Sequence, residues 1–217
     1  KENFEQRFVF TQFLKNGNMV GFGTGKGYEI DLDGNIVFET PDYITSVHHD
    51  FNKSPRDTYF FISAIIENQA CPQECNSNLP DIIPWQGDMF MEIDKYGNEI
   101  WSWNTFDHFS INEYNPYYAE IYNGWGEMDW THSNSVTFDE NSGAVFISAR
   151  NLSRITKIDY ETQNVIWNMG ATACAMLLGC SLWKSWTKNS QLQEQLESSN
   201  LASKKLEGQL SKAESAS

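Results

Sequence analysis

A histidine, an asparagine and an arginine are grouped in one stretch of the sequence. Residues 129–136 read D-W-T-H-S-N-S-V, and residues 147–150 read I-S-A-R. The amide of Asn134 and the guanidinium of Arg150 donate hydrogen bonds, and the guanidinium keeps its positive charge at any working pH. A neutral imidazole such as that of His132 can act as a nucleophile. These residue types predict an anion-binding site.

The spacing of these residues fits one β-hairpin. Alternation along a strand turns His132 and Asn134 toward the same face, and Arg150 ends the expected partner strand near the level of His132. Arg154 follows closely and would add positive charge. The alternative is structural: Asn134 and Ser135 shape a turn, and Arg150 pairs with a surface acid.

Three segments of the chain resemble one another and predict hairpins. Residues 28–37, 91–101 and 156–167 each contain a turn, Asp-Gly-Asn, Tyr-Gly-Asn or Thr-Gln-Asn, between two short alternating strands. Such turns between alternating runs are typical of β-hairpins. A second repeat supports the first, because F-I-S-A occurs at residues 61–64 and again at 146–149.

A four-stranded unit repeated in this way is typical of a propeller blade. We predict an all-β fold in which residues 8–170 form about three blades of four-stranded antiparallel sheets. This is a partial β-propeller, because closed propellers have roughly 4–8 blades. Equivalent positions of a repeat face the same way, so His49 and His132 should lie at matching places near the channel. The alternative is a β-sandwich in which these histidines cap strands at the surface.

The run His48-His49-Asp50 is the second candidate group. Neighbours along a strand face opposite sides, and the repeat favours His49 as the inward residue. His48 remains a candidate for binding. The alternative is that this segment is an exposed polar stretch before a turn.

Charge is distributed unevenly along the 217 residues, whose formal net charge is −14. Residues 1–170 hold 10 Lys and Arg against 25 Asp and Glu, whereas residues 171–217 hold 5 against 4. An acidic surface repels phosphate backbones, so nucleic acid is not an expected partner. An anionic substrate then needs a local positive pocket. No apolar run reaches the roughly 18 residues that span a bilayer, so no transmembrane segment is expected.

Two cysteines, Cys71 and Cys75, form a close pair in a polar loop. We predict a local disulfide between them in an oxidising compartment, with two free thiols as the alternative. Further ligands for a metal ion cannot be placed around them, so no metal site is expected.

The chain resembles the arylsulfotransferase family, the aryl-sulfate sulfotransferases that do not use the nucleotide donor PAPS. The resemblance covers about residues 8–170. Its most specific parts are His49-Asp50, Trp101-x-Trp103, Asp129-Trp130-x-His132-x-Asn134-Ser135-Val136, Ser148-x-Arg150 and Ile166-Trp167-x-Met169-Gly170.

The resemblance implies a six-bladed propeller, usually exported, and therefore an extracytoplasmic location (periplasmic, secreted or luminal). It implies transfer of a sulfuryl group from an aryl sulfate donor to a phenolic acceptor through a sulfated histidine, with no metal or other cofactor. Carried over, His132, Asn134 and Arg150 would bind the sulfuryl oxygens, and His49 would assist protonation or binding. His132 and His49 are thus the expected catalytic residues, and Asn134, Arg150 and His48 the substrate-binding ones.

The sequence departs from the family after Gly170. The family's nucleophilic histidine belongs to a later blade, whereas all four histidines here lie at or before His132. We expect two regions: the arylsulfotransferase-like blades at 1–170, and an apolar linker with a helical tail at 171–217. Leucines at 192, 196, 206 and 210 give the tail an interrupted heptad, which suggests a protein partner or self-association through residues 183–217.

Two functions of different class follow from this pattern. The first is an arylsulfotransferase, incomplete here because the nucleophile-bearing blade is missing. The second is an inactive propeller that serves as a binding or scaffold module and docks a partner through its helical tail.

Overall fold

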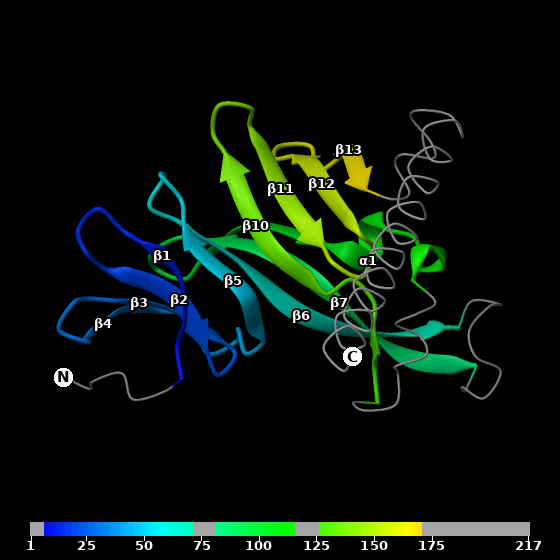
Figure 1. Cartoon of the computed structure of the whole chain (residues 1–217), viewed down its shortest axis with the longest axis horizontal. Helices are drawn as coiled ribbons and strands as arrows, with labels where there is room; N and C mark the ends of the chain where they lie inside the picture. Colours follow the sequence, from blue (N-terminus) through cyan, green and yellow to red (C-terminus); the bar gives the residue numbers. More distant parts are fainter. Residues whose placement is uncertain (1–6, 72–80, 116–125, 171–217) are drawn as a thin grey trace, which may run out of the picture. The chain divides into compact units, whose positions relative to one another are not determined.

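The computed structural model describes residues 7–71, 81–115 and 126–170. Their strands form three antiparallel sheets that follow one another along the chain (Figure 1). The first sheet contains β1 (Val9–Phe13), β2 (Met19–Gly23), β3 (Lys26–Ile30) and β4 (Ile36–Glu39). The second contains β5 (Val47–Lys53), β6 (Tyr59–Ala70), β7 (Ile82–Ile93) and β8 (Glu99–Asn104). The third contains β10 (Ser133–Asp139), β11 (Ala144–Ala149), β12 (Arg154–Asp159) and β13 (Val165–Gly170).

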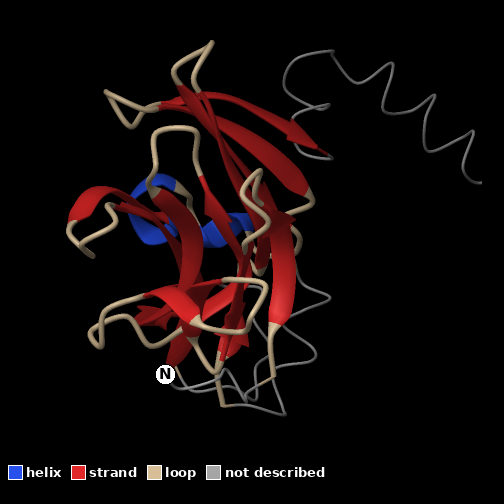
Figure 2. Cartoon of the chain, turned by 90° about the vertical axis from the view of Figure 1, so that its left-hand side faces the viewer, coloured by secondary structure: helices blue, strands red, loops and turns tan. Residues whose placement is uncertain are grey.

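Each of these sheets is a meander, since neighbours in sequence are neighbours in space. A further short strand, β9 (Met128–Asp129), pairs in parallel with β7 and brings the chain to the start of the third sheet. Helical structure among the described residues is limited to α1 (Thr105–His108) and the 3-10 turn η1 (Ile111–Glu113), which lie together in Figure 2.

The three predicted hairpins are present, and an aspartate shapes the turn of each. The carboxylates of Asp31, Asp94 and Asp159 accept hydrogen bonds of 2.8 to 3.0 Å from main-chain N–H groups further along their turns. Gly34 and Gly97 supply the left-handed backbone that the first two turns need, with φ of 80° and 86°. The repeated sequence therefore encodes a repeated turn.

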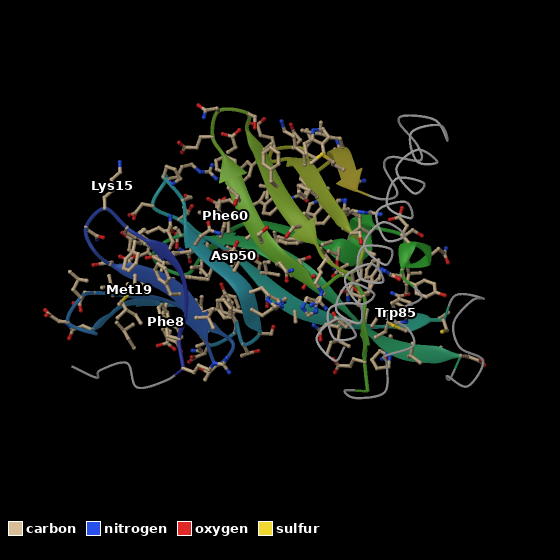
Figure 3. All side chains as sticks on the ribbon, viewed as in Figure 1. Phe8, Lys15, Met19, Asp50, Phe60 and Trp85 are labelled. Carbon is tan, nitrogen blue, oxygen red and sulfur yellow. The ribbon has the colours of Figure 1, made fainter. Side chains whose placement is uncertain are left out.

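The first five residues of β6, Tyr59 to Ser63, are buried on both faces of the strand, which explains the apolar run there. Tyr59 and Phe61 pack in a core shared with the first sheet, and Phe60 and Ile62 pack in a core shared with the third. Phe60 is seen among the strands at the middle of the described region in Figure 3. The second sheet is thus sandwiched between the other two, in the order in which the sheets occur along the chain.

Buried glutamates clamp each pair of adjacent sheets. Glu92 on β7 accepts hydrogen bonds from Arg56 Nη2 at 2.8 Å, from Thr58 Oγ1 at 2.5 Å and from the Tyr160 hydroxyl of the third sheet at 2.6 Å. Glu29 on β3 accepts in the same way from a lysine and a tyrosine of the second sheet. The two glutamates occupy the same position of the repeat, so the clamp itself is repeated.

The first strands of adjacent sheets are also joined, because side chains of one strand form hydrogen bonds to main-chain groups of the other. The side-chain amide of Gln12 bonds both the N–H and the carbonyl of Lys53, at 2.8 and 3.2 Å. One boundary later, Asp50 accepts from the Val136 N–H at 2.9 Å and Asn52 donates to the Val136 carbonyl at 2.8 Å. These contacts fix β5 against β10, which matters for the site below.

The prediction of an all-β chain built from four-stranded antiparallel sheets is confirmed. Closure of the sheets into a propeller ring stays a prediction. The predicted apolar linker and helical tail at 171–217 lie outside the described residues.

Candidate active site

The described sheets bring two of the predicted histidines into contact. His48 and His49 lie on β5, and His132 comes directly before β10. The ring centroids of His49 and His132 are 4.7 Å apart, and those of His48 and His49 are 5.1 Å apart. Arg150, directly after β11, donates its main-chain N–H to the carbonyl of His132 at 3.2 Å. Three imidazoles and one arginine thus meet at the adjoining ends of strands from two sheets.

An irregular backbone presents two of these rings. His49 and His132 both have a left-handed conformation, with φ of 58° and 45°. The strand register shifts between Val47 and Phe51 and again close to Ser133, so each histidine lies at or beside a bulge. Bulges re-aim side chains and are frequent next to active sites. They allow each ring to leave the pleat of its sheet and meet the other.

A carboxylate holds the His132 ring. Asp129 Oδ2 lies 2.5 Å from His132 Nδ1. The main chain of Asp129 is itself anchored, because its carbonyl accepts a 2.7 Å hydrogen bond from the Asn151 amide. A carboxylate can only accept, so this contact places a proton on Nδ1 and leaves Nε2 as the nitrogen that can meet a ligand.

A second carboxylate, Asp88 on β7, lies beneath the histidines and is 1% exposed. Its Oδ2 accepts from Thr131 Oγ1 at 2.5 Å and from the Ser133 N–H at 2.8 Å. Its Oδ1 lies 3.0 Å from His48 Nε2, a contact that is an ion pair when His48 is protonated and is not aligned as a hydrogen bond. Burial would raise the pKa of Asp88, but these partners outweigh it and lower that pKa.

The surroundings of His49 disfavour its protonated form. Partial burial of the ring is the largest cause of a lowered pKa, followed by the positive charges of His48 and His132 when these are protonated. Arg150 acts in the same direction, and Asp88 opposes it. His49 is therefore neutral at neutral pH, and its ring can accept a proton.

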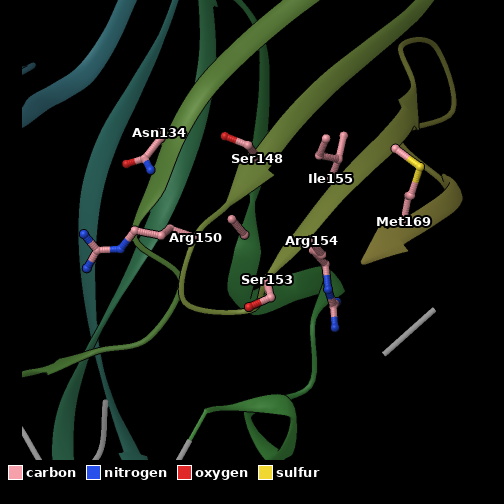
Figure 4. Close-up of a pocket in the computed structure, with 8 residues that line it drawn as sticks. Asn134, Ser148, Arg150, Ser153, Arg154, Ile155 and Met169 are labelled. Atoms are coloured by element: carbon pink, nitrogen blue, oxygen red, sulfur yellow. The ribbon is translucent and has the colours of Figure 1, made fainter. Parts of the chain in front are cut away.

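Asn134 and Arg150, the two residues other than histidine that are predicted to bind the anion, line one groove. Asn134 and Arg150 are exposed and border an open groove of about 390 Å³ on the third sheet. Its other lining residues are Ser148, Ala149, Ser153, Arg154, Ile155 and Met169 (Figure 4). Figure 4 shows the Asn134 and Arg150 side chains at the same end of the groove. The guanidinium of Arg150 donates from Nε to the neighbouring Asn151 Oδ1 at 3.1 Å.

Arg154, the other cation expected near the site, has a different role. Its Nη1 lies 2.9 Å from Glu113 Oε2, and its guanidinium lies 4.8 Å from the centre of the Phe109 ring. Its side chain is 5% exposed. The charge of Arg154 is thus neutralised within the fold, whereas Arg150 adjoins His132 through its main chain and its charge acts on His49.

The sequence analysis assigned no role to the two carboxylates. Asp129 was part of the recognised pattern, but its contact with His132 depends on a left-handed turn. Asp88 stands 44 residues before His132, and only the folded chain brings it to Thr131 and Ser133, the neighbours of that histidine. Strand β7 contains two acids, Asp88 and Glu92, so the sequence does not single out Asp88.

The sequence also raised the questions of a disulfide, a metal site and a membrane-spanning segment. The Cys71 sulfur is disulfide-bonded, but Cys75 lies outside the described residues, so their pairing stays a prediction. Within residues 7–71, 81–115 and 126–170, no group of three or more His, Cys, Asp or Glu residues is placed to hold a metal ion. In that same part of the chain, no helix has the length and apolarity needed to cross a membrane.

Comparison with known proteins identifies the family. The model of the family described as Arylsulfotransferase (ASST) matches residues 3–177. A search of curated proteins gives no match. The family match spans most of the chain and includes both strand ends that carry the clustered histidines. The chain therefore belongs to the arylsulfotransferase (ASST) family.

Proposed function

We propose that the cluster of His49, His132 and Arg150 binds the sulfuryl group of an aryl sulfate, which the protein transfers to a phenolic acceptor. The observation that supports this most directly is the meeting of His49 and His132, whose ring centroids are 4.7 Å apart, beside the strand end that carries Arg150. Membership of the arylsulfotransferase family supports the same reaction class.

Each side chain has a role that follows from its chemistry. Arg150 and Asn134 donate hydrogen bonds to the sulfuryl oxygens, where negative charge develops during transfer. His132 turns Nε2 toward the sulfur because Asp129 occupies Nδ1. His48, beside His49 and Asp88, completes the wall of the site. An acidic protein holds an anion here because these donors are concentrated in one place.

The proposed transfer proceeds in two steps. A histidine nitrogen forms a bond to sulfur while the bond from sulfur to the aryl oxygen breaks and its electron pair leaves with the phenolate. The acceptor phenol then forms a new oxygen–sulfur bond, the nitrogen–sulfur bond breaks, and neutral His49 takes the phenol proton. We assign the accepting nitrogen to Nε2 of His132, because Asp129 occupies Nδ1 of that ring and His49 serves as the base.

The proposal is tested by release of nitrophenol from 4-nitrophenyl sulfate, with and without a phenol acceptor. We expect acceptor-dependent release that falls by about 10²–10³-fold in Arg150→Gln, as for loss of one preorganised donor to a developing charge. Arg7→Gln, at an exposed arginine outside the cluster, should behave like the wild type. Equal activity of Arg150→Gln and wild type would contradict the assignment.

The second function, an inactive binding module, makes a different prediction in the same assay. It predicts binding of the aryl sulfate with no release of nitrophenol, and retention of a protein partner through residues 183–217.

An extracytoplasmic location belongs to the first proposal, and the disulfide-bonded state of Cys71 supports it, because disulfides persist in oxidising compartments.

A further inference from the structure

We infer that Asp129 and Asp88 are positioning residues that preset His132 before a ligand arrives: Asp129 selects the tautomer of its ring, and Asp88 holds the left-handed turn on which it stands. This inference deepens the proposed function and rests on it. Neither carboxylate needs to touch the substrate. Their effect passes through the position and the protonated nitrogen of the His132 ring.

Asp129 is held firmly enough to orient a ring. It forms part of β9, where Gln86 of β7 is its strand partner. Its carbonyl accepts from the Asn151 amide at 2.7 Å, and its carboxylate meets His132 Nδ1 at 2.5 Å. Since a carboxylate accepts only, the neutral ring carries its proton on Nδ1 and keeps a lone pair on Nε2. Free histidine in water prefers the opposite tautomer, so the preference is imposed by the protein.

Asp88 holds the residues on either side of His132, one through its side chain and one through its main chain. Its Oδ2 accepts from the Thr131 hydroxyl and from the Ser133 N–H, the residues before and after His132. A left-handed residue other than glycine is strained and persists only where its surroundings enforce it. Two hydrogen bonds to one buried carboxylate supply that enforcement.

The same carboxylate joins the two histidine-bearing segments. Its second oxygen lies 3.0 Å from His48 Nε2, so Asp88 connects β5 to the turn before β10. His49 follows His48 directly, and its ring contacts His132. Through these contacts the side chain of Asp88 controls how far apart the His49 and His132 rings lie.

The tautomer is tested by nitrogen–proton correlation NMR on the full chain labelled with ¹⁵N-histidine. We expect the His132 ring of the wild type to carry its proton on Nδ1, and that of Asp129→Ala to carry it on Nε2. Asp107→Ala removes an exposed carboxylate beside another histidine, His108, and should leave the His132 signals unchanged. A wild-type proton on Nε2, or no change in Asp129→Ala, would overturn the role of Asp129.

Binding of 4-nitrophenyl sulfate, followed by titration, separates this inference from the function on which it rests. We expect a loss of affinity of about 10–100-fold in Asp129→Ala, taking as a guide the effect of removing an orienting partner from a metal-binding histidine. Failure of the wild type to bind would remove the proposed function while the tautomer result still stood. Equal binding by wild type and Asp129→Ala would remove the inference alone.

The role of Asp88 is tested with two variants, Asp88→Asn and Thr131→Val. The second is needed because replacing a buried carboxylate can prevent folding. The second variant keeps the size of a buried side chain and removes one of the two hydrogen bonds at the turn. We expect both to shift the His132 ring signals and to weaken binding of 4-nitrophenyl sulfate, by about tenfold or more for Asp88→Asn. Asp139→Asn is the matched control, because Asp139 lies at the other end of β10, where its carboxylate accepts from the Ser142 hydroxyl of its own turn, and it should leave signals and affinity unchanged. Folded Thr131→Val with wild-type signals and affinity would overturn the role of Asp88.

Discussion

His49 is the residue through which pH should act on the site. Burial and the neighbouring positive charges lower its pKa from the ordinary value, which is about 6.5. We expect its ring to titrate below that value in an NMR titration, and inorganic sulfate to raise the midpoint, because a bound anion favours the protonated ring. A midpoint at or above about 6.5 without sulfate would contradict the description of its surroundings.

The lowered pKa of His49 also makes the stability of the fold depend on pH. The unfolded chain binds a proton at His49 more readily than the folded chain does. The contribution of this residue is therefore fully present above about pH 6.5 and is lost as the pH falls from there toward its folded pKa.

The sequence was sufficient to group these histidines with the arginine, but not to describe how they are held. The pattern around His132 and Arg150 is local, so a hairpin places the two near one another. Their supports are not local. Asp88 contacts Thr131 and Ser133, the two neighbours of His132, from a distant strand, and Asp129 meets the ring only because the backbone at His132 has a positive φ. No property of the sequence near these carboxylates indicates such contacts.

At the scale of the elements, the buried glutamates hold adjacent sheets together. Glu92→Gln would keep the size of the side chain but leave the Arg56 guanidinium without its opposite charge. We expect the free energy of unfolding to fall by about 2 kcal/mol, less than the usual figure for a fully buried pair because Arg56 is partly exposed. Urea denaturation measures this change.

The matched control for that prediction is Glu140→Gln. Glu140 is exposed in the turn after β10, and its replacement should change stability by no more than about 0.5 kcal/mol. Equal effects of the two substitutions would mean that the clamp between the second and third sheets contributes nothing specific.

The hairpins could be predicted because each depends on a few neighbouring residues. Asp31, Asp94 and Asp159 fold their own turns through hydrogen bonds within five residues. The clamps at Glu29 and Glu92 could not be predicted, since their partners lie 24 to 68 residues away along the chain. Short-range chemistry repeats visibly in a sequence, whereas the matching of one sheet to the next becomes visible only in three dimensions.

At the scale of the whole molecule, the excess of negative charge should oppose folding. A formal net charge of −14 repels itself in the compact state, and salt screens that repulsion over about 10 Å at 0.1 M ionic strength. We expect the thermal unfolding midpoint at pH 7 to rise when the ionic strength increases from about 0.01 M to about 0.15 M. Near the acidic isoelectric point the rise should vanish, and a rise of equal size there would contradict this explanation.

Composition and repetition were enough to predict the class of the whole molecule. Alternating strands, turn residues and a repeated motif predicted an all-β chain of four-stranded sheets, and three such meanders are present. The long pairing of β6 with β7, which extends to Ala70 and Ile82, was not predicted. The outer part of β6, residues 65–70, mixes apolar and polar residues, and such a mixture occurs in strands and in loops alike.

The left-handed backbone at His49 and His132 restricts what mutagenesis at this site can reveal. Alanine at either position would remove the ring, and alanine also adopts the left-handed conformation poorly. A loss of activity could then come from the missing imidazole or from a change in the backbone. Asparagine is among the residues that tolerate this conformation best. Comparing the asparagine and alanine variants would therefore separate the contribution of the imidazole from that of the backbone, and over evolutionary time such positions should accept only a narrow set of replacements.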